Sequence, residues 1–225
     1  MPAALVFGGG GQIGAACVEA LHGDGFEVTA TGRTAASGVE AYDPLADKLA
    51  LPGEGAFDAV VWAQGANLAD SVLDFDLSRH RAIYDANVTF VLESLNALLV
   101  SDRLAKGARL CVISSVWQTA ARPNKLSYMV SKAALQGLVL SAATDLAERG
   151  ILVNAVLPGA IDTPMTRANL SPEQIERLAG MTKFNRLAAL GDVAALVAFL
   201  CSAANTSITG QFVAVDLGFQ NARLV

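Results

Sequence analysis

Histidine and cysteine are both scarce in this sequence of 225 residues, which contains two histidines and three cysteines. Cys17, Cys111 and Cys201 are an odd number, lie far apart and have apolar neighbours. This pattern argues against a disulfide framework and indicates reduced thiols in the core of a cytoplasmic protein. His22 and His80 have no cysteine near them in the sequence, so we also expect no zinc or other metal site.

Charged residues are few as well, at 16% of the chain, and the net charge is -5. Because the balance is acidic and no basic cluster occurs, nucleic acid is not expected to be a partner. No uninterrupted apolar run reaches the length of a membrane span, and the chain begins without the charged segment of a signal peptide. Hydrophobic residues make up 53% of the sequence, which predicts one domain over residues 1–225 with a full core.

Strand-like and helical segments alternate along the chain. This order predicts an α/β fold, a Rossmann-type doubly wound parallel β-sheet flanked by helices, in a single domain. The predicted strands cover residues 3–7, 26–32, 39–42, 56–66, 109–113, 151–159 and 210–218. The predicted helices cover residues 12–22, 45–51, 76–100 and 192–201, with another that carries Tyr128 and Lys132 and ends near residue 149. Residues 166–190 are polar and partly helical, and we interpret them as a lid over the substrate.

A glycine-rich turn separates the first predicted strand from the first helix. Gly8, Gly11 and Gly14 fit the pattern G-x-x-G-x-x-G, and Gln12 and Ile13 lie between the last two glycines. Glycine permits positive φ angles and lets backbone N–H groups approach a pyrophosphate at the start of a helix. The turn therefore predicts a binding site for the phosphates of a dinucleotide.

The second predicted strand ends without the acidic residue that binds the adenosine ribose of NAD. Arg33 follows the last glycine of the turn by 19 residues (33 − 14), and Thr34 comes next. An arginine here suits the 2′-phosphate of NADP, so we predict NADP(H) over NAD(H) as the cofactor. Asp43 either contacts the adenine amino group or caps the following helix. Gly65, near the end of the fourth predicted strand, would let the backbone pass close to the cofactor, and Ala63 is a further expected cofactor contact.

Residues 109–132 carry the strongest chemical signal. They begin as a buried strand, continue through Ser114 and Ser115 into a loop, and enter a helix with Tyr128 and Lys132. Residues four apart share one face of a helix, so the ammonium group would favour the phenolate and lower the pKa of the tyrosine. A serine hydroxyl could hold a substrate oxygen beside the phenol. By itself, however, Y-x-x-x-K fits a solvated helix face better than a catalytic site.

Asn87 lies inside an apolar helical stretch, where asparagine is a poor helix former and costly to bury without partners. An exposed side chain or a contact that bends the helix would also account for it. The four polar residues Asn87, Ser115, Tyr128 and Lys132 are separated by 28 (115 − 87), 13 (128 − 115) and 4 (132 − 128) residues.

With these spacings the chain resembles the short-chain dehydrogenase/reductase family over nearly its whole length, because that family has an asparagine, serine, tyrosine and lysine tetrad. The resemblance implies that Ser115, not Ser114, binds the substrate oxygen and that Tyr128 transfers the proton. It implies that Lys132, together with the positive nicotinamide, lowers the pKa of the phenol and that Lys132 holds the nicotinamide ribose. Asn87 would bend its helix and hold a water in a proton relay from Lys132.

Two further parts of the sequence resemble this family. Residues 154–159, N-A-V-L-P-G, match the motif that follows the sixth strand, and Thr163 matches the residue that contacts the nicotinamide carboxamide. The resemblance thus adds Pro158, Gly159, Ile161 and Thr163 to the expected cofactor contacts.

The chain also departs from the family pattern at the glycine turn and after the fourth strand. Phe7 replaces the usual threonine, and Gln12 replaces the middle glycine, although Gly11 supplies one a place earlier. Ala63 replaces the asparagine that ties neighbouring strands in relatives.

The resemblance implies an NADP(H)-dependent oxidoreductase that interconverts a carbonyl and a secondary alcohol, with Tyr128 as acid and base. Its partner would be a small molecule bound by Ser115, Trp117, Tyr128 and Met165. Val116, Gln118 and Leu126 are further candidates for this pocket. Its apolar walls and one amide suggest a modest, mainly apolar carbonyl compound or alcohol as the substrate.

Family members often form oligomers, so a homotetramer or homodimer is expected. The apolar residues expected at the contact are Val91, Leu95, Leu98, Leu135, Leu138, Val139 and Ala142. Two other functions remain open: a non-catalytic NADP(H)-binding sensor, and an epimerase or dehydratase that uses a bound cofactor.

Overall fold

The computed structural model describes residues 1–45 and 50–221, apart from the side chains of Pro164, Met165 and Asn169. In this part of the chain seven strands form a parallel sheet in the order β3-β2-β1-β4-β5-β6-β7. The strands are β1 (Ala3–Phe7), β2 (Glu27–Gly32), β3 (Glu40–Ala41), β4 (Phe57–Trp62), β5 (Leu104–Ile113), β6 (Leu152–Pro158) and β7 (Phe212–Val215). The winding direction reverses between β1 and β4, which confirms the predicted doubly wound α/β fold.

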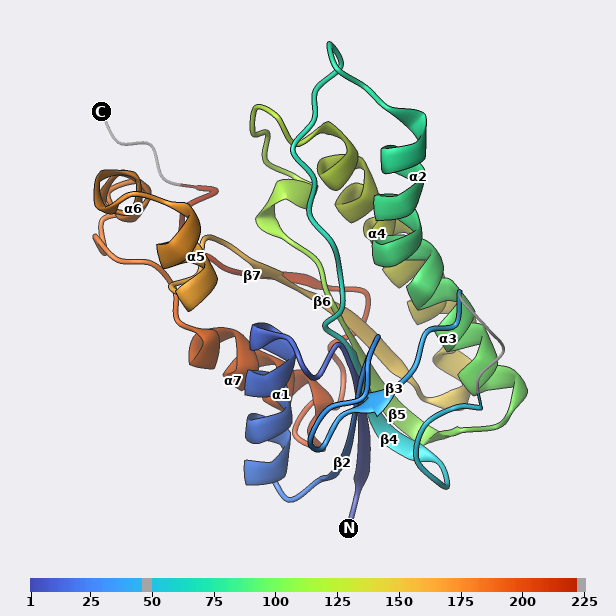
Figure 1. Ribbon diagram of the computed structural model, residues 1–225. Coiled ribbons are helices and arrows are strands. Elements are labelled where there is room, and N and C mark those ends of the chain that lie inside the picture. The colour runs from blue at the N-terminus through green and yellow to red at the C-terminus, as the bar shows by residue number, and fades with distance from the viewer. Residues whose placement is uncertain (46–49, 222–225) are drawn as a thin grey trace.

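Helices cover both faces of the sheet (Figure 1), with α1 and α7 on one face and α2, α3 and α4 on the other. The helices are α1 (Gln12–Gly23), α2 (Leu77–Tyr84), α3 (Phe90–Val100), α4 (Leu126–Asp145), α5 (Pro164–Asn169), α6 (Pro172–Ala179) and α7 (Leu190–Cys201). A π-helical turn spans Asp85–Thr89, and 3-10 turns span Val116–Gln118 and Ala147–Arg149. The helix predicted at residues 45–51 falls mostly on residues outside the described part.

The two faces of the sheet pack into two apolar cores. Leu5 and Phe7 of β1 face the core beneath α3 and α4, whereas Ala4 and Val6 face the core beneath α1 and α7. Burial on both faces explains why β1 is apolar throughout and does not alternate. Because all strands are parallel, their carboxyl ends meet at one edge, where such folds bind ligands.

Two strand boundaries differ from the sequence prediction. β4 ends at Trp62 because its neighbour β1 ends at Phe7 and the chain turns away at Gly8. The Ala63 N–H still donates to the Phe7 carbonyl (2.9 Å). β5 begins earlier than expected, at Leu104, and its register against β4 shifts between Phe57 and Ala59. The polar stretch around Gly107, whose φ is 73°, interrupts the apolar pattern and hides the start of this strand in the sequence.

The predicted helix at residues 76–100 is continuous, but it changes from α-helical to π-helical winding in its middle and back again. Its start is capped by Asp76, which accepts a hydrogen bond from the Arg79 N–H (2.8 Å), and its middle is the π-helical turn. Over Leu77–Val100 this helix has the length and composition of a membrane span, although its sequence is not an uninterrupted apolar run. Its apolar side packs on the sheet, with Val91 and Leu98 almost fully buried, so the apolar composition serves the core.

The residues expected at a subunit contact mostly face the chain's own core. Six of the seven are buried: Val91, Leu95, Leu98, Leu135, Val139 and Ala142. That expectation was therefore wrong for these six, because the sequence does not distinguish the face of a helix that packs on its own sheet. The large apolar side chains exposed on α3 and α4 are Leu92, Val100, Val130 and Leu140, at 49%, 78%, 42% and 46%.

Candidate active site

The glycine turn between β1 and α1 has no room for a side chain at Gly8, Gly9 or Gly14. A Cβ on Gly8 would lie 2.5 Å from the backbone nitrogen of Gln64, and Gly8 has a φ of 76°. A Cβ on Gly14 would lie 2.1 Å from the carbonyl oxygen of Gly8. Gly11 precedes α1, and no side chain caps the helix there. The turn therefore presents bare backbone at the start of a helix, which suits a pyrophosphate.

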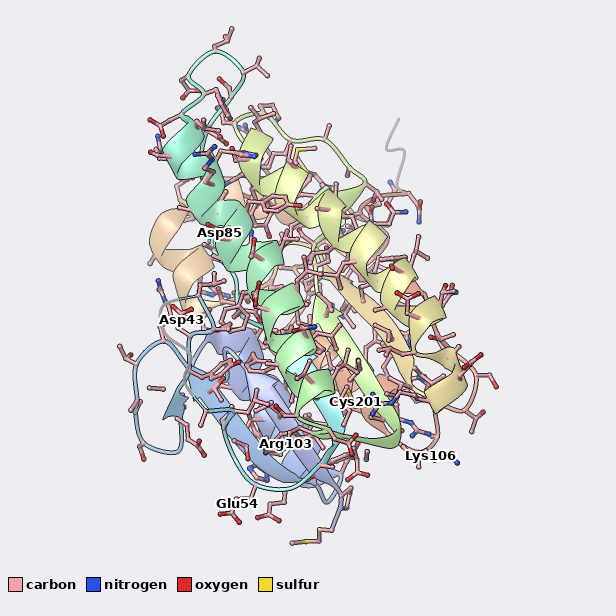
Figure 2. The ribbon with its side chains drawn as sticks, turned by 90° about the vertical axis from the view of Figure 1, so that its right-hand side faces the viewer. Asp43, Glu54, Asp85, Arg103, Lys106 and Cys201 are labelled. Carbon is pink, nitrogen blue, oxygen red and sulfur yellow. The ribbon has the colours of Figure 1, made fainter. Side chains whose placement is uncertain are left out.

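A cleft of about 590 Å³ lies beside this turn at the carboxyl edge of the sheet. Its lining includes seven of the predicted cofactor residues: Gly8, Gly11, Arg33, Thr34, Asp43, Ala63 and Gly65. Figure 2 shows two acidic residues of the lining, Asp43 after β3 and Asp85 on the π-helical turn. The side chain of Asp43 also accepts a hydrogen bond from the Leu45 N–H (3.0 Å), so it shapes its own turn as well.

Two buried polar atoms of this cleft, the Thr31 hydroxyl oxygen and the Gln64 amide oxygen, have no hydrogen-bond partner among the residues that the structure describes. Burying such atoms unpaired is costly, so a polar ligand that reaches them would gain from the contact. Together with the bare glycine turn, these atoms fit a dinucleotide.

Four aromatic rings support the floor of the cleft. The ring of Phe7 lies 5.4 Å from Tyr42, 5.7 Å from Trp62 and 5.6 Å from Phe90, measured between ring centroids. Tyr42 and Phe90 also line the cleft, whereas Phe7 and Trp62 are fully buried. Phe7, which replaces the threonine usual in relatives, therefore joins a packed aromatic cluster, a role that no local sequence pattern signals.

Asn87 ties three segments together from the π-helical turn. Its side-chain oxygen accepts from the Ala66 N–H (2.7 Å), and its amide group donates to the Ala66 carbonyl (3.1 Å) and to the Ser131 hydroxyl (2.8 Å). A Cβ on Gly65 would lie 2.9 Å from this oxygen and 3.6 Å from Lys132 Nζ. The exposed-side-chain alternative is thus wrong, and the amide hydrogens are used within the chain. The proton relay through a water at Asn87 stays a prediction.

Ser115, Tyr128 and Lys132 come together where β5 ends and α4 begins. Lys132 is buried, donates to the Ile113 carbonyl (2.9 Å) and has its Nζ 5.8 Å from the ring centroid of Tyr128. None of the ion pairs within the described residues includes it. Ser115 accepts from the Trp117 N–H (3.3 Å) and lines one cavity with Tyr128.

The neighbouring Ser114 has a different environment from Ser115. Its hydroxyl donates to the side-chain oxygen of Gln118 (2.7 Å), so its hydrogen is held within the chain. This difference agrees with the choice of Ser115 as the serine that binds substrate.

The pKa values in this cluster differ from the sequence expectation. Burial raises the pKa of Tyr128, and a hydrogen bond with Ser115 opposes that rise. Burial lowers the pKa of Lys132 to about 8. The pKa of the tyrosine is therefore raised and not lowered as expected, because desolvation of the phenolate outweighs the hydrogen bond with Ser115.

A smaller cavity of about 160 Å³ opens over the phenol of Tyr128. Its lining residues are Ile13, Asn67, Ser114, Ser115, Trp117, Arg122, Lys125, Tyr128, Pro158, Gly159 and Ile161. Of the expected pocket residues, Trp117 lines it, whereas Val116 is buried in the core. Gln118 is buried against Ser114, Leu126 is not part of the lining, and the side chain of Met165 lies outside the described part. Two cations and an asparagine line the cavity, so its lining does not favour the mainly apolar substrate that the sequence suggested.

The segment after β6 brings the remaining predicted residues to the same edge. Ile161 is buried and lines the cavity together with Pro158 and Gly159. Thr163 caps α5 by accepting from the Thr166 N–H (3.0 Å). Gln12, Gly14 and Thr163 line neither the cavity nor the cleft, although the first two belong to the glycine turn.

Known proteins are similar to this chain in sequence and in fold. A family profile described as enoyl-(acyl carrier protein) reductase matches residues 41–220. The 3-oxoacyl-[acyl-carrier-protein] reductase FabG of Salmonella typhimurium is 30% identical over 234 residues, covering 96% of each chain. The chain belongs to the short-chain dehydrogenase/reductase family. As a member, it is an oxidoreductase of carbonyl and alcohol groups that uses NAD(H) or NADP(H).

Solved structures of this family superpose on the whole chain. Acetoin dehydrogenase from Enterobacter cloacae is 29% identical, with a TM-score of 0.82 over 99% of this chain and 96% of that one. A gluconate 5-dehydrogenase from Burkholderia cenocepacia, solved with NADP and tartrate, gives a TM-score of 0.88 over 99% and 96% at 23% identity. The second likeness supports the fold alone.

In this short-chain dehydrogenase/reductase a polar network also fixes the start of α4, which sequence reasoning missed. Asp70 is buried and accepts hydrogen bonds from both the backbone N–H (3.0 Å) and the hydroxyl of Ser127. His80 Nδ1 lies 2.9 Å from the same hydroxyl. Since Tyr128 follows directly in the chain, this network positions the phenol. An acidic residue 57 positions before its partner gives no local sequence signal.

The buried Lys132 makes stability depend on pH. Its pKa falls from 10.5 to about 8 on folding, so the folded chain binds fewer protons than the unfolded chain between these values. Lys132 therefore destabilises the fold most below pH 8, and this cost disappears as the pH rises through about 10.5.

We expect the free energy of unfolding of the wild type, minus that of Lys132→Met, to rise between pH 8 and pH 10. The rise is on the order of 2 kcal/mol. Urea unfolding at both pH values measures it, and the subtraction removes the other titrating lysines. A difference that stays constant or falls would show that Lys132 keeps its usual pKa in the fold.

Proposed function

We propose that this chain is an NADP(H)-dependent oxidoreductase that interconverts a carbonyl and a secondary alcohol, with Tyr128 as the acid and base. The observation that carries the proposal is the shared position of the Ser115 hydroxyl and the Tyr128 phenol in one cavity, with the Lys132 ammonium 5.8 Å from the phenol ring. Outside that cavity, the glycine turn and the larger cleft offer a fitting dinucleotide site.

Different residues of the cavity carry out different parts of the proposed reaction. When bound, the nicotinamide cofactor supplies or accepts the hydride. Ser115 holds the substrate oxygen by donating its hydroxyl hydrogen. Its hydrogen bond with Tyr128 keeps the two hydroxyl groups together, whereas the Ser114 hydroxyl donates to Gln118. Tyr128 gives that oxygen a proton in the reductive direction and removes it in the oxidative direction. A raised pKa keeps the phenol protonated at neutral pH, which suits reduction.

Lys132 and Asn87 support the phenol from the other side. The Lys132 ammonium would hold the nicotinamide ribose and favour the phenolate that forms when Tyr128 gives up its proton. Asn87 keeps the π-helical turn, Ala66 and Ser131 in place, and Ser131 in turn donates to the Tyr128 carbonyl (2.8 Å).

A panel of small aldehydes and ketones, followed through NADPH absorbance, tests the proposal. We expect at least one compound to consume NADPH, with the corresponding alcohol formed in equal amount. NADPH that binds without being consumed by any compound would instead favour the non-catalytic sensor.

Preference for NADP(H) rests on Arg33. Its side chain is exposed and lines the cleft next to Thr34, in the position suited to a 2′-phosphate. We expect Arg33→Ala to weaken NADPH binding about tenfold or more while leaving NADH binding nearly unchanged, because only NADPH carries that phosphate.

Fluorescence titration with both cofactors measures this preference. Arg177→Ala is a matched control, since that arginine is exposed on α6, which is not part of the cleft. Tighter binding of NADH than NADPH by the wild type would overturn the preference.

We also propose a cytoplasmic homo-oligomer, a tetramer or a dimer. Its location rests on Cys17, Cys111 and Cys201, which are all buried free thiols. Its assembly rests on the exposed apolar side chains of α3 and α4, among them Leu92 and Leu140.

Light scattering at micromolar concentration checks the assembly. We expect a dimer or tetramer for the wild type, and a shift toward monomer for Leu92→Glu and Leu140→Glu, because a charge in an apolar contact is costly. Val72→Glu, at an exposed apolar site before α2, is the control that should keep the wild-type mass. A wild-type monomer would remove the claim.

A further inference from the structure

Two cations line the cavity over the Tyr128 phenol. Arg122 and Lys125 come from the loop between β5 and α4 and share the cavity with Ser115 and Trp117. No carboxylate lies within ion-pair distance of either cation in the part of the chain that the structure describes, where the ion pairs are Arg149–Asp102, Arg167–Asp162 and Arg186–Asp192. In a chain of net charge -5, this is a local excess of positive charge.

Lys125 is held in place by neutral oxygens. Its Nζ donates to the side-chain oxygen of Asn67 (2.8 Å) and to the Leu68 carbonyl (3.2 Å), and it lies 5.9 Å from the ring centroid of Tyr128. An ammonium group has three N–H donors, so these two contacts leave one for a ligand. Asn67 also lines the cavity. Lys125 is therefore fixed at the cavity wall, near the expected position of the substrate carbonyl oxygen.

An aromatic ring orients the Arg122 side chain, whose N–H donors make no hydrogen bond among the described residues. Its guanidinium carbon lies 5.6 Å from the ring centroid of Trp117, a contact that orients the planar group without using its N–H donors. A guanidinium group offers paired donors that match the two oxygens of a carboxylate.

The two cations also affect each other. Burial lowers the pKa of Lys125, and the charge of Arg122 lowers it further, while Asp70 acts weakly in the opposite direction. Like charges that face one small space repel, and an anion between them relieves the repulsion and pairs both groups.

We propose that the substrate is a small carbonyl compound, or the matching alcohol, that carries a carboxylate bound by Arg122 and Lys125. This inference rests on the proposed function, since it places the carbonyl oxygen at Ser115 and Tyr128 in the same cavity.

The cavity is small, at about 160 Å³, and Pro158, Gly159 and Ile161 on its lining are expected cofactor contacts. The substrate therefore shares this space with the nicotinamide and must be small, because pockets for drug-sized ligands begin at about 300 Å³. Oxo acids of a few carbon atoms have the required chemistry.

Matched substrate pairs test the carboxylate directly. We compare kcat/KM for acetoacetate with acetoacetamide and for pyruvate with pyruvamide, using NADPH, in the wild type, Arg122→Gln, Lys125→Met and Lys106→Met. Lys106 is the control because it is exposed near the amino end of β5, at the opposite edge of the sheet (Figure 2). We expect the wild type to prefer the acid about tenfold or more over the amide of the same shape.

In both cavity variants we expect this preference to fall about tenfold, whereas Lys106→Met should keep it. Arg122→Gln is informative even if Lys125→Met disturbs the loop, since no hydrogen bond from the Arg122 side chain is part of the described network. An unchanged preference in Arg122→Gln, or a wild type that reduces the amides as well as the acids, overturns the carboxylate site.

Binding without turnover separates this inference from the proposed reaction. Malonate, a dicarboxylate with no carbonyl to reduce, is titrated calorimetrically into the NADPH-loaded protein. Saturable binding that weakens about tenfold in Arg122→Gln and Lys125→Met, but not in Lys106→Met, supports the carboxylate site even if no compound is turned over. Absence of malonate binding in a protein that reduces neutral carbonyl compounds overturns the site and leaves the proposed reaction standing.

Discussion

Tyr128→Phe is expected to lower kcat for carbonyl reduction by roughly a thousandfold, within the range of 10²–10⁴ known for a positioned proton donor. The change removes one hydroxyl from the cavity that also holds Ser115. The substrate oxygen then loses its proton donor, while the glycine turn and the larger cleft are untouched. The dissociation constant of NADPH should therefore stay within about twofold of wild type, because a lost transition-state contact lowers kcat without a loss of cofactor binding.

Tyr84→Phe is the matched control for this variant. Tyr84 is half-buried on α2, where its ring lies 6.3 Å from that of His80, and it lines neither the cavity nor the cleft. It should keep near-wild-type turnover. Near-normal turnover by Tyr128→Phe, with the same substrate and cofactor, would refute the proton role of the phenol.

Gly14→Ala is expected to weaken NADPH binding by about fivefold to 150-fold, the range that corresponds to overpacking of about 1–3 kcal/mol. The added Cβ would lie 2.1 Å from the Gly8 carbonyl oxygen, 2.7 Å from the Gly8 carbonyl carbon and 2.9 Å from Gly9 Cα. These are backbone atoms of the turn itself, so the turn must shift and its N–H groups move away from the phosphates. Calorimetric titration with NADPH measures the loss.

Gly23→Ala separates this steric effect from any general sensitivity of α1. It places a Cβ at the end of the same helix, where no heavy atom lies within 4 Å. Its NADPH affinity should equal that of wild type, and thermal melts of both variants show whether the fold is retained. A folded Gly14→Ala with unchanged affinity would remove the glycine turn from the cofactor site.

Much of the fold follows from local sequence patterns. β1 was predicted with its observed bounds because a strand buried on both faces is continuously apolar and ends at a glycine turn. The end of β4 was missed because it depends on where β1 leaves the sheet, which is a relation between segments far apart in the chain. The inward-facing side of α3 was missed for the same reason, since residues such as Leu95 and Leu98 are buried only by the sheet beneath them.

The candidate site divides in a similar way. The four residues Asn87, Ser115, Tyr128 and Lys132 could be chosen because their spacings match the tetrad of the short-chain dehydrogenase/reductase family, whereas the tyrosine and lysine alone give a weak signal. The direction of the pKa shift of Tyr128 could not be predicted from the sequence, because burial of the phenol depends on the whole cavity. Arg122 and Lys125 stand in the sequence six and three places before Tyr128, yet only the folded loop brings both to the wall of the cavity.

The most direct test of the account is transfer of deuterium to a carbonyl substrate from NADPH that carries deuterium at both hydrogens of the nicotinamide C4 position, read by mass spectrometry of the product. The account predicts an alcohol that carries one deuterium on the former carbonyl carbon in the wild type. It predicts almost no labelled alcohol in Tyr128→Phe, although that variant still binds the labelled cofactor. Unlabelled alcohol from the wild type, or equal labelled product from both proteins, would contradict the proposed reaction and the role of Tyr128.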